Sequence, residues 1–181
     1  MMIPLYMIYS NIAITSLSEV AMISLQVSDI KDCMTKLLSG DVFDRFYLVE
    51  ADIRMGITYY LDGHLNPDFF DSDTAAALTR HYCLWKEARP FVFQIIRGKR
   101  QPLGFKIILA VPPKTVLRFL QESGCSLREE DIEGIYVNFL FEPGKLLITT
   151  GISSRIFSPD RSLEHYADDY IKRYLLSKGI G

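Results

Sequence analysis

Two stretches of this chain decide its fold because they set out the same series of elements twice. The second stretch consists of FKIILAV (residues 105–111), PPKTVLRFLQESG (112–124) and IEGIYVNFLFEPGKLLITTG (132–151). The first consists of MISLQV (22–27), SDIKDCMTKLLSG (28–40) and FDRFYLVEADIRMGITYYLDG (43–63). Each predicts a strand, an amphipathic helix that ends at a Ser-Gly pair, and a β-hairpin. Few residues are identical between the copies, so the repeat is one of pattern.

Two further helices are predicted outside these units. In the segment Thr74–Ala88, apolar residues recur at helical spacing, and Pro90 is expected to end the pattern. A last helix, Ser162–Lys178, carries acidic residues early and basic residues late, which suits the helix dipole, and Gly179 follows its end.

A second hairpin is predicted in the middle of the chain. The segments Phe91–Ile96 and Leu103–Val111 are apolar on both faces, as in central strands, and RGKRQP (97–102) between them is a basic tip. Aromatic residues within these segments alternate with other apolar residues, which favours the core over a base-stacking surface. These aromatic residues are Phe91, Phe93 and Phe105.

The expected architecture is therefore α+β. Two pseudo-repeated strand-helix-hairpin units form a largely antiparallel sheet with helices on one face, and the mid-chain and C-terminal helices pack nearby. A chain of 181 residues suits one full core, so residues 22–181 are predicted to be a single domain. Residues 1–21 are predicted to be an N-terminal extension, with Met22 as the natural start or a loosely attached preceding segment.

The N-terminal residues and the cysteines indicate the cellular compartment in which this protein is expected. Residues 1–21 lack the basic start of a secretory signal and are interrupted by polar residues, so a membrane anchor is the less favoured alternative and no membrane association is expected. The three cysteines, Cys33, Cys83 and Cys125, are far apart and form no CxxC, which indicates neither a disulfide framework nor a zinc knuckle. A reducing cytoplasm fits best.

Positive charge is concentrated in the middle of the chain. The segment from Ala88 to Gln121 has no acidic residue, and its basic residues are Arg89, Arg97, Lys99, Arg100, Lys106, Lys114 and Arg118. Like charges crowded at a tip repel one another, so an anionic partner is a reasonable explanation for them. Two structural explanations stay open. Basic residues keep a hairpin soluble and discourage edge pairing, and they can neutralise the acidic segment Glu129–Glu133.

An acidic cluster offers a second chemistry. Asp62, His64, Asp68 and Asp71 follow a predicted strand, and such side chains in a loop can hold Mg²⁺ or Mn²⁺ for hydrolysis. Turn formation and helix capping explain the same residues more simply. The sequence has no HExxH, GxSxG, GxGxxG or GxxxxGK[ST] motif, so no catalytic residue, metal or cofactor is predicted.

The leading hypothesis is a non-enzymatic cytoplasmic protein that binds nucleic acid or another polyanion. The residues predicted to contact the polyanion are Arg89, Arg97, Lys99, Arg100 and Lys106. The alternatives are the metal-dependent hydrolase and a protein-interaction adaptor that uses sheet edges or the Tyr-rich last helix to bind a protein partner.

Several strings resemble an uncharacterised family of small clostridial and related Firmicutes proteins. They are FDRFYLVEADIR (43–54), YYLDGHLNPDFF (59–70), Trp85 with Arg89-Pro90 ahead of a predicted strand, IIRGKRQPLGFKI (95–107) and LLITTG (146–151). The resemblance runs from Met22 to about Ile180 and implies no activity. In element order alone, the chain is also similar to one domain of a DNA sliding clamp, in which two repeats place their helices side by side on one sheet. Such a likeness of fold implies little about function.

Overall fold

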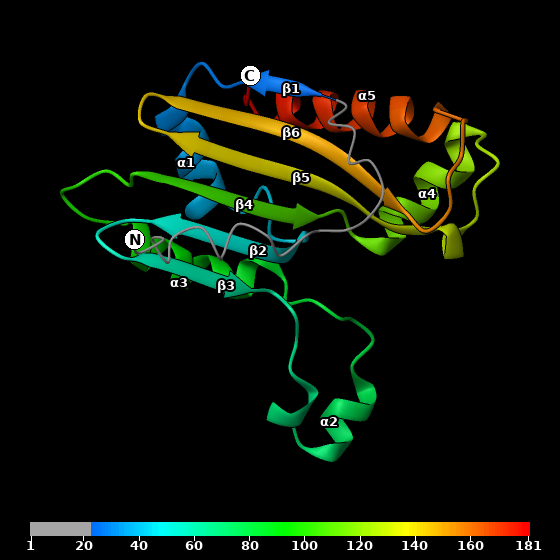
Figure 1. Ribbon diagram of the computed structural model, residues 1–181, viewed down its shortest axis with the longest axis horizontal. Coiled ribbons are helices and arrows are strands. Elements are labelled where there is room, and N and C mark those ends of the chain that lie inside the picture. The colour runs from blue at the N-terminus through cyan, green and yellow to red at the C-terminus, as the bar shows by residue number, and fades with distance from the viewer. Residues whose placement is uncertain (1–22) are drawn as a thin grey trace, which may run out of the picture.

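The computed structural model describes residues 23–181, and the predicted extension at residues 1–21 lies outside them. Within that range, six strands form one open antiparallel sheet in the order β1-β6-β5-β4-β2-β3. The strands are β1 (Ser24–Gln26), β2 (Tyr47–Arg54), β3 (Thr58–Asp62), β4 (Gly104–Ala110), β5 (Ile132–Glu142) and β6 (Lys145–Ser154). Figure 1 shows β5 and β6 as the longest strands.

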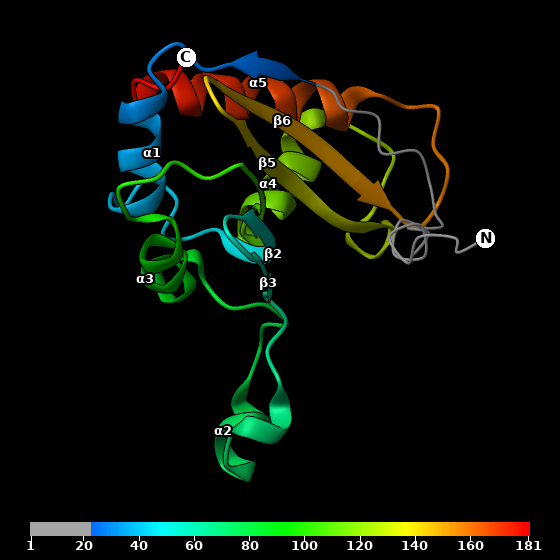
Figure 2. The same ribbon diagram turned by 60° about the vertical axis from the view of Figure 1, so that its left-hand side comes forward.

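Four helices cover one face of this sheet, and the core lies between the two layers (Figures 1 and 2). They are α1 (Ile30–Leu38), α3 (Trp85–Ile96), α4 (Pro113–Ser123) and α5 (Ser162–Ser177). The buried positions of α5 recur every four residues, so the helix presents one apolar stripe to the sheet. In β4, every second side chain points to the helices, so Phe105, Ile107 and Leu109 are buried in the core. The α+β class predicted from the sequence is confirmed.

The two strand-helix-hairpin units are confirmed as β1-α1-β2-β3 and β4-α4-β5-β6. Residues next to the helices of these units fix the helix ends. Asp29 accepts a hydrogen bond from the backbone N–H of Asp32 and so caps the start of α1, and Gly124 ends α4 with a left-handed φ of 66°. The units pair their strands differently, because β4 lies beside β5 of its own unit whereas β1 pairs with β6 of the other.

The prediction of one helix over Thr74–Ala88 is wrong. A short helix α2 (Ser72–Ala77) is followed by Leu78 as its C-cap, and α3 begins only at Trp85. The prediction also ended the helix at Pro90, yet α3 continues through it. The reason is burial: the indole of Trp85 and the side chain of Val92, seven residues on, are both fully buried, so tertiary packing overrides the local cost of proline.

The hairpin predicted from Phe91–Ile96 and Leu103–Val111 is therefore also wrong, because its first strand is the second half of α3. Only β4 forms, and the basic segment 97–103 is a helix-to-strand loop. Helical geometry turns Phe91 and Phe93 outward, with 67% and 37% of their surfaces exposed, against the prediction that both lie in the core. Phe105 is buried as predicted and stacks on Phe141 with ring centroids 5.0 Å apart.

Between β3 and α3 the chain forms an arm, residues 63–84, that projects from the sheet (Figure 1). It carries the 3₁₀ helix η2 (Pro67–Phe69) and α2. Its two sides meet at the base, where His64 and Tyr82 form an antiparallel bridge. Arg80 then pairs with Glu87 of α3 through two hydrogen bonds of 2.7 and 2.9 Å, which lowers the pKa of the Glu87 carboxyl. The arm is thus anchored to the first turn of α3.

None of the helices in the described range is both long enough and apolar enough to span a bilayer.

Candidate functional site

Three basic side chains crowd the loop that joins α3 to β4. Arg97, Lys99 and Arg100 are exposed, and none of them forms an ion pair with another residue in the 23–181 range. The loop lies at the end of the sheet that also holds the β2–β3 and β5–β6 turns (Figure 1). We call this region, Arg97 to Leu103, the basic loop.

The other two predicted contact residues have structural partners. The Arg89 guanidinium donates a hydrogen bond to the carbonyl oxygen of Gly40, and its Nη2 lies 3.3 Å from Oδ1 of Asp44. It therefore ties α3 to the segment that follows α1. The Nζ of Lys106 lies 3.2 Å from a carboxylate oxygen of Glu50 on the neighbouring strand. Neither charge is as available to a ligand as those of the basic loop.

The acidic segment does not neutralise the basic loop. Its 3₁₀ helix, η3 (Glu129–Asp131), lies at the opposite end of the sheet, where α4 runs into β5 (Figure 1). There, Arg128 pairs with Glu130 at 2.7 Å and lies 3.7 Å from Asp131.

A hollow of about 480 Å³ near the basic loop is lined by both acidic and basic side chains. Its charged lining residues are Asp52, Arg54, Lys106, Glu142 and Lys145.

Exposed aromatic rings accompany the basic loop. Phe93 lies four residues before Arg97, which caps the end of α3, so the two side chains belong to one face of the helix terminus. Phe91 lies two residues before Phe93 and is the more exposed of the two rings, but side chains two residues apart point to different sides of a helix, so only Phe93 shares a face with Arg97. Neither exposed ring was predicted, although the spacing of Trp85, Ala88 and Val92 indicates a helix that would expose them.

The acidic residues proposed for the hydrolase alternative act as local structure. Asp62 accepts hydrogen bonds from the backbone N–H of His64 and lies 2.6 Å from its Nδ1, and the hydrogen bonds with His64 lower the pKa of the Asp62 carboxyl. Asp71 caps α2 through Thr74, and Asp68 lies in η2. Over residues 23–181 no three His, Cys, Asp or Glu side chains converge as metal ligands would. This geometry gives the hydrolase alternative no support.

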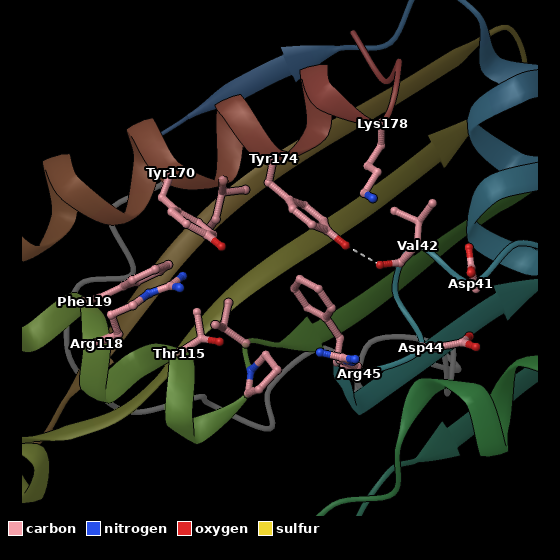
Figure 3. A pocket seen from close by; sticks show the side chains of 14 residues that line it. Asp41, Val42, Asp44, Arg45, Thr115, Arg118, Phe119, Tyr170, Tyr174 and Lys178 are labelled. Atoms are coloured by element: carbon pink, nitrogen blue, oxygen red, sulfur yellow. Dashed lines mark hydrogen bonds between the residues drawn. The ribbon is translucent and has the colours of Figure 1, made fainter.

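A cleft of about 640 Å³ opens on the helix-covered side of the molecule (Figure 3). Helices α4 and α5 form two of its walls, and the loop 41–46 between α1 and β2 forms the third. Tyr174 fixes one edge, because its hydroxyl donates a hydrogen bond to the carbonyl oxygen of Val42. The Tyr-rich helix that the adaptor alternative invoked therefore turns this tyrosine toward the protein.

Cations from three separate segments reach into this cleft (Figure 3). Arg118 comes from α4, Lys178 from the end of α5 and Arg45 from the loop. The Arg118 guanidinium lies 4.8 Å from the Tyr170 ring centroid, and a hydrogen bond with the Tyr170 hydroxyl raises the pKa of Arg118. The Lys178 ammonium lies 5.7 Å from the centroid of Tyr174. Each of these two exposed cations thus lies near an aromatic ring, a contact that contributes about 0.5–1 kcal/mol at such sites.

Comparison with known families identifies the chain. The profile of a family of unknown function (DUF5721) matches residues 36–181. The chain belongs to this family. The resemblance to an uncharacterised family is thereby confirmed, and membership in DUF5721 carries no activity with it. No curated protein matches the chain. No solved structure matches it either, so the likeness to a DNA-clamp domain is not confirmed.

Proposed function

We propose that this DUF5721 protein is a cytoplasmic nucleic-acid-binding protein that contacts single-stranded nucleic acid through the basic loop. The observation that carries the proposal is that Arg97, Lys99 and Arg100 stay exposed and form no ion pair with the residues described. Phosphates need only such a surface. Its three cysteines are free, which supports a reducing compartment.

The neighbouring rings favour a single strand over a duplex. Bases of a single strand are free to stack on exposed aromatic side chains, and each stacked base contributes about 1–3 kcal/mol. Phe91 and Phe93 supply such rings on the helix that leads into the basic loop. Bases in a duplex are already stacked, so a duplex would gain only the phosphate contacts.

The test is the affinity of the full chain for a fluorescently labelled 30-nucleotide single strand, measured by anisotropy at several salt concentrations. Arg97→Ala/Lys99→Ala/Arg100→Ala is expected to weaken binding roughly 10- to 100-fold at low salt. The slope of log affinity against log salt should become shallower by about 2, since each lost phosphate contact contributes about 0.7 to it.

A matched variant controls for net charge. Lys31→Ala/Lys114→Ala/Lys172→Ala also removes three exposed cations, from α1, α4 and α5, and is expected to keep its affinity within about twofold. Phe91→Ala/Phe93→Ala should weaken single-strand binding and leave the affinity for heparin unchanged, because heparin has no bases to stack. Equal losses in the two triple variants would contradict the proposal.

A further inference from the structure

We propose that the cleft between α4, α5 and the loop 41–46 is a binding site for a phosphate-bearing small molecule, separate from the basic loop. Its volume of about 640 Å³ lies in the range of small-molecule sites. The inference does not depend on the proposed function, because none of the lining residues of the cleft belongs to the basic loop.

The charge balance of the cleft favours an anion. Arg45, Arg118 and Lys178 line it, and none of the three forms an ion pair within the described part of the chain. Two carboxylates also line it, but Asp44 is paired with Arg89, which leaves Asp41 against three cations. All three side chains are exposed, so water weakens their mutual repulsion, but together they give the cleft a positive potential that attracts a multiply charged anion.

Neutral groups of the cleft complete the chemistry. The hydroxyl of Thr115 on the first turns of α4 faces the same space as Arg118 (Figure 3). Helix α4 begins at this wall, and the positive end of its dipole adds to the potential, although Pro113 has no N–H and Thr115 and Val116 donate theirs to the carbonyl oxygen of Pro112. Arginine forks and hydroxyl donors are groups that recognise phosphate oxygens. The cations sit on opposite walls, which suits two or three linked phosphates better than one.

The aromatic rings hold the site in shape before a ligand arrives. The rings of Tyr170 and Tyr174 already lie against Arg118 and Lys178, and the hydroxyl of Tyr174 is bound to Val42. Side chains that are positioned in advance lose less conformational entropy on binding. The cations and the Thr115 hydroxyl would contact the phosphates of the ligand, and the remaining volume of the cleft admits an attached organic group.

The experiment is calorimetric titration of the full chain with sodium triphosphate, ATP and adenosine, with EDTA present so that the phosphates carry their full charge. Triphosphate and ATP are expected to bind, and adenosine is not. Arg118→Gln/Lys178→Gln should weaken both anions by at least about tenfold, since each substitution removes a charge-assisted contact. Lys114→Gln/Lys172→Gln, on the same two helices, should leave the affinities unchanged.

Two further measurements separate this site from the basic loop. The variant Arg97→Ala/Lys99→Ala/Arg100→Ala should bind triphosphate as the natural chain does, even if its affinity for single strands is lost. On adding triphosphate to the natural chain, amide chemical shifts should change at Thr115, Arg118 and Lys178. This measurement does not depend on whether any variant folds. Absence of binding by both anions, or shifts confined to residues 97–103, would overturn the proposal.

Discussion

Arginines of the same basic segment make different contacts in the folded protein. Arg89 and Arg97 lie eight residues apart, yet Arg89 joins α3 to the carbonyl of Gly40 while Arg97 is exposed. What separates them is their place on α3. Arg89 lies one turn after buried Trp85, and Arg97 lies beyond the last helical residue. A count of charges along the sequence therefore overstates the surface open to an anion.

Asp168 shows the reverse case, a charge placed where it costs stability. Burial against β6 raises the pKa of its carboxyl, although Thr150 donates a 2.7 Å hydrogen bond to Oδ1. A carboxyl whose folded pKa lies above its unfolded value binds its proton more tightly in the native state. As pH rises from the unfolded pKa to the folded pKa, ionisation of this carboxyl therefore lowers the free energy of unfolding. The full penalty is present at neutral pH.

We expect Asp168→Asn to raise the free energy of unfolding at pH 7 by about 0.5 kcal/mol, a size typical of a partly solvated charge. The amide oxygen can still accept the hydrogen bond from Thr150. Urea denaturation at pH 3 and pH 7 measures the effect, and the gain should shrink at pH 3, where the natural carboxyl is protonated. Asp169→Asn, at the exposed neighbour, is the control. A gain of equal size at both pH values would contradict this account.

At the scale of elements, α3 is held by contacts that local sequence does not reveal. The indole Nε1 of Trp85 donates a 2.8 Å hydrogen bond to the carbonyl oxygen of Leu37, so α3 satisfies a free carbonyl at the end of α1. Glu87 accepts a 2.9 Å hydrogen bond from the backbone N–H of Leu84 and so caps α3. These contacts at its start keep the helix in place through Pro90.

Pro90 should therefore be a stability defect that packing tolerates. Pro90→Ala restores a helical N–H donor and removes the clash of the ring with the preceding turn. We expect it to raise the free energy of unfolding by about 1 kcal/mol, less than the full helix preference because alanine also frees the unfolded chain. Urea denaturation measures it, with Gln94→Ala as the exposed control on the same helix. Destabilisation would mean that the proline fits its site without strain.

At the scale of the whole molecule, the sheet separates three surfaces. The basic loop lies at one end, η3 at the other, and the cleft opens on the side covered by helices (Figure 1). The arm projects away from all three and adds little to the core. Between Leu65 and Tyr82 no side chain that the structure describes is fully buried. Phe69, in η2, is 84% exposed.

The arm should therefore be removable. Replacing residues 67–79 by Asn-Gly keeps the hydrogen bond from Leu65 to His81 and the pairing of Arg80 with Glu87, and Asn-Gly suits a two-residue hairpin turn. We expect the melting temperature to change by no more than about 4 °C, which corresponds to about 1 kcal/mol for a chain of this size. Calorimetry checks it. Loss of a cooperative transition would show that the arm stabilises the fold.

Neighbouring residues alone predict the α+β class, the two strand-helix-hairpin units and the ends of α1, α4 and α5. These features depend on local periodicity, caps and turns, which neighbouring residues specify. The prediction divided α3 into the end of one helix and the start of a strand, because the apolar segment FVFQII fits both a helix and a strand. The burial of Trp85 and Val92 on one face makes it helical. Which cations pair and which stay exposed depends on contacts that form when the chain folds. Ion pairs such as Arg89 with Asp44 join residues far apart in the chain, and the cleft draws its cations from three elements that meet only on folding.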